Sequence, residues 1–218
     1  GTGEFFDMLT RFDLWRPGII PKHTRPLDYL LPLGELPHSL IAHGNYLADD
    51  EIDFLATHPN MTTVFCPRTH AFFDHADHPW ERLLDAGASI CIGTDGRSSN
   101  PDYSLWSEMQ FLARQVTPDR LSQILEMGTL RGSRSLGAAD ISGTITLGTR
   151  ADLCIISLGA ESATDPWSVL FEKGSRPVAT LIGGKMATAV EPSSGFHHPD
   201  RELQAKLRRS VEQTSEET

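Results

Sequence analysis

The stretch ASICIGTD (residues 88–95) joins a short apolar run to an acidic residue that directly follows it. Two earlier stretches have the same form: LIAH (residues 40–43) ends at a histidine, and TTVFCPRTH (residues 62–70) ends in a polar loop. A segment with helical spacing of apolar residues follows each run, and the runs recur about every 25 residues, as in barrel-type βα units. This repeated order of strand, loop and helix predicts a parallel sheet with helices packed outside it.

The chain on either side of these units has a different texture. Before residue 39, two aromatic-rich stretches separated by prolines predict two short helices joined by a loop. After Pro118, residues 121–127 predict a helix, and a weaker helix is expected around residues 133–136.

Beyond residue 138 the pattern becomes β-rich. Three short runs bounded by glycines, at residues 143–148, 151–156 and 178–185, predict a small β subdomain. The pair Gly183-Gly184 is expected to form a two-residue hairpin turn. Residues 201–218 alternate in charge, which predicts a surface helix that frays into a flexible acidic tail.

Composition excludes several classes of partner. The chain of 218 residues has 19 basic and 29 acidic side chains, and its net charge of −10 would repel a phosphate backbone, so no nucleic-acid partner is expected. No apolar run approaches the ~20 residues of a membrane span, and the first residues lack the basic start of a secretory signal. We therefore expect a cytoplasmic protein that does not enter a membrane. Cys66, Cys91 and Cys154 lie in apolar runs and are expected to be reduced and buried.

Polar residues that could carry chemistry follow the three apolar runs. In a parallel βα array the carboxyl ends of the strands meet at one mouth, which places His43, the loop at residues 66–70 and Asp95 together. Each has an ordinary structural alternative: His43 as a loop hydrogen-bond donor, Asp95 as the cap of the next helix, and Arg68 as the partner of a surface acid. The polar run DHADH (residues 74–78) has the residue types of a metal cluster, but its place before a helix is typical of a solvated loop.

These residues resemble a known family, the metal-dependent amidohydrolase superfamily. The similarity is greatest to its branch of adenosine-type deaminases and triazine chlorohydrolases, which includes enzymes that deaminate S-adenosylhomocysteine, methylthioadenosine or aminodeoxyfutalosine. The motifs that carry the resemblance are HGNYL (43–47), CPRTH (66–70), GTDG (93–96), SSN (98–100), EM (108–109), GTITLG (143–148), ADL (151–153) and LIGGK (181–185).

The resemblance implies an α/β fold, namely strands six to eight of a TIM-like (β/α)8 barrel followed by a small β subdomain. Its boundaries would be a partial barrel at residues 1–140, a β-sandwich segment at 141–192, and a surface helix with a flexible acidic tail at 193–218. The family pattern makes Asp95 a metal ligand and proton acceptor, and makes His43 a metal ligand that holds the attacking water or polarises the leaving group. The residues that would line or close over the substrate are Arg68, Thr69, His70, Ser98, Ser99 and Asn100.

The sequence also departs from the family pattern. Only three βα units are present, and the family's His-x-His pair, which supplies two metal ligands, does not occur. The resemblance therefore implies the carboxyl-terminal part of a zinc-dependent, or other divalent-metal, hydrolase that cleaves a C–N or C–Cl bond on a purine-like or triazine ring. The part by itself is expected to be inactive and to bind zinc weakly or not at all.

The resemblance and the incomplete barrel also indicate which partners to expect. The substrate would be a small heterocycle, and a homo-oligomer is expected because an incomplete barrel exposes strand edges. The alternative is a non-catalytic βα/β domain that binds a small ligand or associates with itself.

Overall fold

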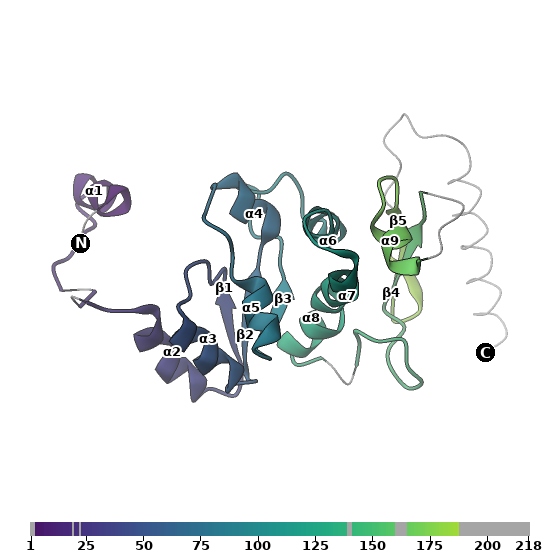
Figure 1. The fold of residues 1–218 in the computed structure, drawn as a ribbon, viewed down its shortest axis with the longest axis horizontal. Helices are drawn as coiled ribbons and strands as arrows, with labels where there is room; N and C mark the ends of the chain where they lie inside the picture. The colour runs from purple at the N-terminus through teal and green to yellow at the C-terminus, as the bar shows by residue number, and fades with distance from the viewer. Residues whose placement is uncertain (1–2, 19, 22, 139–140, 160–164, 188–218) are drawn as a thin grey trace.

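The computed structural model describes residues 3–18, 20–21, 23–138, 141–159 and 165–187 (Figure 1). Its strands are β1 (Ser39–Ala42), β2 (Met61–Phe65), β3 (Ser89–Ile92), β4 (Leu153–Ser157), β5 (Arg176–Ile182) and β6 (Lys185–Ala187). Its helices are α1 (Glu4–Arg11), α2 (Pro26–Gly34), α3 (Asp49–Ala56), α4 (Pro67–Phe72), α5 (Trp80–Asp85), α6 (Leu105–Ala113), α7 (Leu121–Gly128), α8 (Leu130–Ser135) and α9 (Pro166–Phe171), with a short 3-10 helix at Pro118–Arg120. None of the described helices is long and apolar enough to cross a membrane.

The first sheet contains the three predicted βα strands, all parallel, in the order β1-β2-β3. Ala42 pairs with Val64, and Val64 pairs with Cys91, so the three strands end at one edge of the sheet. Within the described residues, the outer edges of β1 and β3 pair with no other strand, and the sheet is open rather than a closed barrel. The polar loops after the strands therefore share one edge, as the sequence predicts.

The hydrophobic core lies between this sheet and the helices that follow its strands. Met61 and Ile90 come from the sheet, and neither is exposed. The helical side chains that bury against them share apolar character and helical spacing, and they include Leu55 of α3, Leu83 of α5, and Ile124 and Met127 of α7. This core fixes the sheet and so the positions of its carboxyl ends.

Two helix starts were not predicted from the sequence. Residues 67–70, expected to be a polar loop, begin α4, with Pro67 as its first residue. Pro166 likewise opens α9, where the Asp165 carboxylate accepts from the N–H groups of Trp167 at 3.3 Å and Ser168 at 3.0 Å. A proline at the first helical position is a recognisable start signal in both cases.

The second sheet is antiparallel, in the order β4-β5-β6. Gly183 and Gly184 join β5 to β6 with φ of 58° and 77°, which confirms the expected hairpin turn. The strand predicted at residues 143–148 is wrong: this segment forms turns, and its apolar side chains Ile145 and Leu147 are 92% and 102% exposed. Its apolar alternation therefore has no partner strand among the described residues.

The second sheet region packs against α6. The indole N–H of Trp106 donates to the Ser175 carbonyl at 3.2 Å, and the Trp106 and Phe171 rings stack with centroids 5.5 Å apart. The proposed boundary near residue 140 stays a prediction. The residues beyond 187, including the predicted tail at 193–218, lie outside the described part of the chain.

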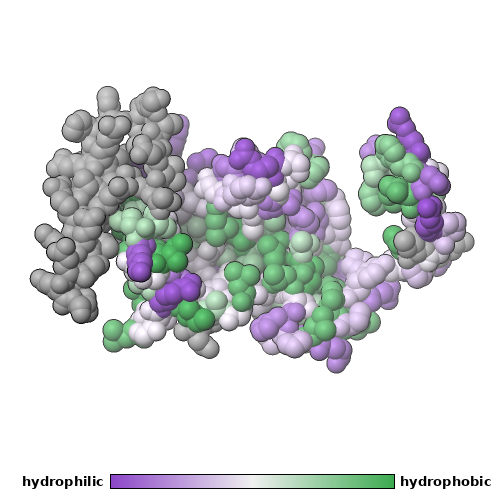
Figure 2. Space-filling view, turned by 180° about the vertical axis from the view of Figure 1, so that it is seen from behind, coloured by the Kyte–Doolittle hydropathy of each residue, from purple (hydrophilic) through white to green (hydrophobic). Residues whose placement is uncertain are grey.

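The two predicted amino-terminal helices are present, but they differ in packing. Helix α2 buries Leu30 in the core, whereas α1 buries no residue and lies apart from the body of the protein (Figure 1). Phe5 of α1 and Phe12 directly after it are exposed, and Figure 2 shows apolar side chains on this part of the chain and over the central face.

The three cysteines are free thiols, but they differ in burial. Cys66, directly after β2, and Cys91 in β3 are buried as predicted, and burial raises the pKa of the Cys66 thiol to about 12. The prediction of burial is wrong for Cys154, which is exposed on β4. No residue of β4 is buried, whereas most residues of β2 and β3 are.

We predict that alkylation of the native chain modifies Cys154 first. Partial desolvation raises the pKa of all three thiols, so exposure decides the order. Mass spectrometry after a short pulse of iodoacetamide should find the label on Cys154, and the same pulse in urea should label all three. Labelling of Cys91 as rapid as that of Cys154 in the native chain would contradict the burial of β3.

Candidate active site

A small cavity of about 90 Å³ opens at the carboxyl edge of the parallel sheet. The residues around it come from the segments that follow the three strands: His43 and Asn45 after β1, Thr69 and His70 in α4 with Phe73 and His75 beyond it, and Asp95 after β3. The structure thus brings together four of the residues that the sequence indicated, namely His43, Thr69, His70 and Asp95.

His43 lies in a tight turn directly after β1. Its N–H donates to the Val64 carbonyl at 2.9 Å, which extends the sheet by one residue, and its φ of 68° then turns the chain sharply. Gly44 follows with φ of 67°, and a Cβ there would lie 2.9 Å from the Thr63 side chain. The close approach to β2 requires glycine at this position.

The His43 turn is fixed from below by His78. The Nε2 of His78 donates to the His43 carbonyl at 2.7 Å, and its ring stacks on Phe65 with centroids 3.9 Å apart. His78 is only 9% exposed, so the expectation of a solvated loop is wrong for this residue. Burial lowers its pKa to about 4, and the imidazole is therefore neutral at pH 7.

Asp95 follows β3 on a similar turn. Gly93 allows the chain to leave the sheet there, because a Cβ at this position would lie 2.7 Å from Val64. Asp95 has φ of 56° and is exposed to solvent at the cavity. The Ser99 hydroxyl donates to its Oδ2 at 3.1 Å, and Thr69 Oγ1 lies 3.0 Å from Ser99 Oγ.

Histidines form the remaining wall. His70 Nδ1 lies 3.2 Å from Asn45 Oδ1, and burial lowers the pKa of His70. His75 Nδ1 lies 2.7 Å from the Tyr46 hydroxyl, and the His70 and His75 ring centroids are 5.3 Å apart. These rings can stack on, or hydrogen-bond to, a planar heterocycle.

Arg68 does not line the cavity. Its Nε donates to Glu108 Oε1 at 2.7 Å, and its Nη2 contacts Asp102 Oδ1 at 2.6 Å. The Arg68 guanidinium lowers the pKa of Asp102. With both carboxylates bound to the guanidinium, the geometry favours the alternative that Arg68 is an ion-pair partner over its role as a substrate ligand.

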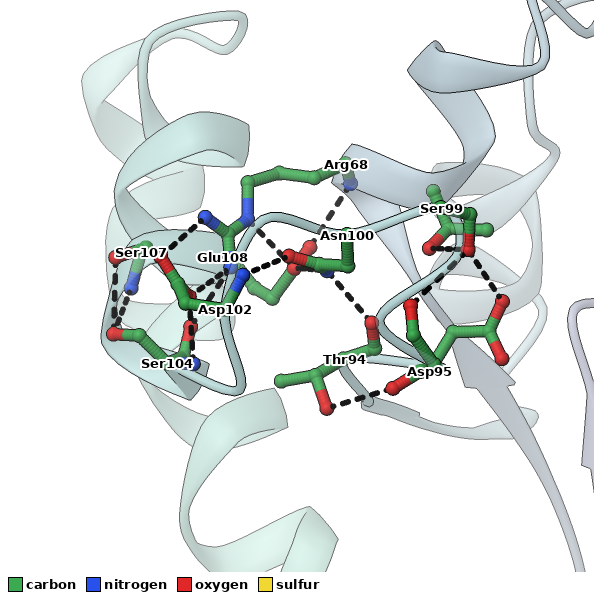
Figure 3. Close-up of polar contacts among 11 residues, drawn as sticks. Arg68, Thr94, Asp95, Ser99, Asn100, Asp102, Ser104, Ser107 and Glu108 are labelled. Carbon is green, nitrogen blue, oxygen red and sulfur yellow. Dashed lines mark hydrogen bonds and ion pairs between the residues drawn. The ribbon is translucent and has the colours of Figure 1, made fainter.

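The SSN loop is divided between surface and interior. Ser98 is exposed, Ser99 is buried beneath Asp95, and Asn100 is 2% exposed. The Asn100 amide donates to the Thr94 carbonyl at 2.6 Å and to Glu108 (Figure 3). Ser99 and Asn100 thus support the Asp95 turn from within the protein.

A metal site requires several ligand side chains close together, and the positions of the described residues show whether they meet this requirement. A catalytic zinc site ordinarily has three protein ligands and a water. Among the described residues, no three histidine, cysteine, aspartate or glutamate side chains lie close enough together to hold one ion. His43 and Asp95 are suitable ligand types at one cavity, but the described residues do not form a complete metal site.

Sequence reasoning missed three residues of this region. Asn45 belongs to the HGNYL motif and lines the cavity, but no role was predicted for it. His78 was predicted to lie in a solvated loop, although the buried Trp80 two residues later indicates where that loop meets the core. Glu108 contributed only to a motif, and its place between apolar Leu105 and Met109 on one helix face was the signal that it is buried.

Comparison with known proteins identifies the family. The family model described as the amidohydrolase family matches residues 15–187, and the chain belongs to this family.

Curated relatives of the chain include deaminases. A 5-methylthioadenosine/S-adenosylhomocysteine deaminase of Haloarcula marismortui is 36% identical over 155 residues, which cover 67% of this chain and 35% of the relative. A 5′-deoxyadenosine deaminase of Methanococcoides burtonii is 31% identical over 162 residues, which cover 71% of this chain and 36% of the relative. The chain therefore spans little more than a third of the length of either relative.

Solved structures show the same fold. The zinc-bound adenosine deaminase of Xanthomonas campestris has a TM-score of 0.68 and 24% identity, covering 97% of this chain and 47% of that one. The atrazine chlorohydrolase of Arthrobacter aurescens with zinc has a TM-score of 0.67 and 18% identity, covering 95% and 51%. At these identities the likeness concerns the fold alone.

We predict that His78 makes the chain sensitive to acid. Its pKa is about 4 in the folded chain and 6.5 ordinarily, so the unfolded chain takes up the proton first as the pH falls. The resulting stabilisation is fully present above pH 6.5, is lost progressively as the pH falls towards 4, and amounts to ~3 kcal/mol. Urea unfolding across this pH range measures the loss.

The matched variants are His78→Gln and His38→Gln. Glutamine at position 78 still donates to the His43 carbonyl but does not titrate, so the pH dependence should become shallower. His38 is exposed, and its replacement should leave the wild-type pH dependence. An equally steep acid loss in His78→Gln would show that His78 is not the residue responsible.

Proposed function

We propose that this chain is the carboxyl-terminal part of a zinc-dependent amidohydrolase that deaminates an adenosine-type ring. Its three parallel strands would be strands six to eight of the complete barrel. The observation that carries the proposal is the convergence of His43 and Asp95 on one cavity, on turns held by hydrogen bonds from the buried side chains of His78 and Asn100.

The choice of deamination rests on the relatives. Those 31% to 36% identical to the chain are deaminases of 5-methylthioadenosine, S-adenosylhomocysteine or 5′-deoxyadenosine. The triazine enzymes are less similar in sequence and support the fold only. We therefore propose cleavage of the exocyclic C–N bond of adenine, with C–Cl cleavage on a triazine as the second candidate.

The residues of this chain would contribute a proton acceptor and a group that holds the attacking water or polarises the leaving group. Zinc at a complete site would lower the pKa of bound water to about 7 and so supply hydroxide at neutral pH. Asp95 would accept the proton of the attacking water, since its carboxylate faces the cavity and Ser99 orients it. His43 would hold that water or polarise the leaving amino group. The remaining ligands would come from outside the described residues.

The other cavity residues would bind the heterocycle. Thr69 and His70 would lie against the ring, and the exposed Ser98 would close over it. Arg68 and Asn100 would support the cavity from the protein interior, through their hydrogen bonds to Glu108 and that of Asn100 to the Thr94 carbonyl. We further propose a cytoplasmic protein that acts on a small heterocyclic substrate and associates with itself, because β1 and β3 present open edges in the described sheet.

We predict that Asp95→Asn in the full-length protein abolishes turnover. The change keeps the shape of the side chain and removes the anionic proton acceptor, so kcat should fall by ~10³-fold or more with the melting temperature unchanged. Ammonia release from 5′-methylthioadenosine, S-adenosylhomocysteine and 5′-deoxyadenosine is the measurement, with chloride release from atrazine as the arm for the second candidate.

Asp53→Asn is the matched control for this prediction. Asp53 is an exposed residue of α3, and the same chemical change there should leave kcat at the wild-type value. Turnover by Asp95→Asn close to that of Asp53→Asn would refute the assignment of Asp95.

We also predict that the 218-residue chain binds zinc weakly when it is purified alone. His43 and Asp95 provide two ligands where a stable catalytic site ordinarily has three. Elemental analysis after dialysis should find far less than one zinc per chain. One tightly held zinc per chain that disappears in His43→Ala would show instead that the chain completes the site by itself or between two copies.

A further inference from the structure

Glu108 is a fully buried carboxylate that the proposed reaction does not use. It lies in α6 with 0% exposure. Its Oε2 accepts from the Arg68 backbone N–H at 2.9 Å, and its Oε1 accepts from Arg68 Nε at 2.7 Å and from the Asn100 amide. A buried charge is costly unless it is paired and hydrogen-bonded, and Glu108 satisfies both conditions.

One branch of this network leads to the backbone of Asp95. The Asn100 amide group that donates to Glu108 also donates to the Thr94 carbonyl at 2.6 Å. This carbonyl belongs to the peptide unit that directly precedes Asp95, whose φ is 56°. Glu108 therefore orients the amide that holds the left-handed turn (Figure 3).

The other branch leads to the Asp95 side chain through α4. Glu108 fixes the Arg68 N–H at the start of that helix, and Thr69 is the next residue. Ser99 donates to Asp95 Oδ2 at 3.1 Å, so the 3.0 Å contact between Thr69 and Ser99 has the Thr69 hydroxyl as donor. Both the backbone and the carboxylate of Asp95 are thus linked to one buried anion.

We propose that Glu108 is a positioning residue that fixes Asp95 relative to Thr69 and His70, the residues of α4 that line the cavity. This inference rests on the proposed function, because it concerns the reaction assigned to Asp95. The Asn100 branch connects this ion pair to the Asp95 turn, so the network reaches beyond the contact between α4 and α6. Arg68 also has Asp102 as a second anionic partner, so neutralising the guanidinium does not depend on Glu108 alone.

The test is Glu108→Gln in the full-length enzyme, assayed by ammonia release from the relatives' substrates. Both carboxylate oxygens of Glu108 accept hydrogen bonds, but in glutamine one of these positions holds an NH2 group, which cannot accept. The variant therefore loses either the hydrogen bond from the Arg68 backbone N–H or the one from the Asn100 amide, so the two branches cannot both persist. We expect kcat to fall ~10- to 100-fold while KM changes less than ~3-fold, because displacement of a reacting group acts mainly on the transition state.

Glu51→Gln is the matched control. Glu51 is 1% exposed, pairs with Arg25, and accepts from the N–H groups of Leu27 and Ala48. It is therefore a buried carboxylate of the same kind, and none of these partners lines the cavity. We expect Glu51→Gln to lower the melting temperature while kcat stays within ~2-fold of wild type.

Each outcome decides the inference. Wild-type kcat in Glu108→Gln, or equal losses of kcat in Glu108→Gln and Glu51→Gln, would overturn it. If Glu108→Gln does not fold, Asn100→Ala takes its place, because this variant breaks the Thr94 branch and keeps the Arg68–Glu108 pair. Unchanged kcat there would also overturn the inference. Turnover retained by Asp95→Asn would refute the proposed function instead, so the two failures are distinguishable.

Discussion

The parallel register of β1, β2 and β3 is the constraint on which the candidate site depends. Because Ala42, Val64 and Cys91 lie side by side, the chain leaves the sheet at nearly the same level three times. Each exit loop starts within reach of the other two, although His43 and Asp95 are far apart in the sequence. The strands are short, so the helices packed below them, rather than the strand pairing alone, keep this edge in place.

Next to that edge of the sheet, buried polar residues stabilise the turns by hydrogen bonds, whereas apolar packing stabilises the rest of the fold. Two of the loops turn through left-handed backbone, and in each a buried donor from a later part of the chain binds a carbonyl beside the turn. His78 holds the carbonyl of His43, and Asn100 holds that of Thr94. Both donors are nearly inaccessible to water, which strengthens each hydrogen bond and raises the cost of losing it. The positions of the cavity-lining residues His43 and Asp95 consequently depend on the buried polar side chains of His78 and Asn100.

The sequence predicted the arrangement of the strands well because apolar runs and glycines are local signals. The three βα units, the hairpin at Gly183 and Gly184, and the meeting of His43 with Asp95 all follow from such signals. The ion-pair partner of Arg68 and the role of His78 did not, since each depends on a residue far away in the sequence: Glu108 is 40 residues from Arg68, and His43 is 35 residues from His78. The strand that was wrongly predicted at residues 143–148 shows another limit of prediction from the sequence. Alternating apolar and polar residues form a strand only where a second strand is available to pair with them.

The left-handed backbone at residues 43 and 95 also restricts what substitution can achieve at this edge. Apart from glycine, the residues that adopt this conformation most readily are asparagine, aspartate and histidine, since bulky or branched side chains clash with the backbone there. Those same side chains carry the oxygen and nitrogen atoms that bind protons and metal ions. A library of variants at these two positions would therefore be filtered by backbone geometry before any selection for activity, and the survivors would be enriched in groups capable of chemistry.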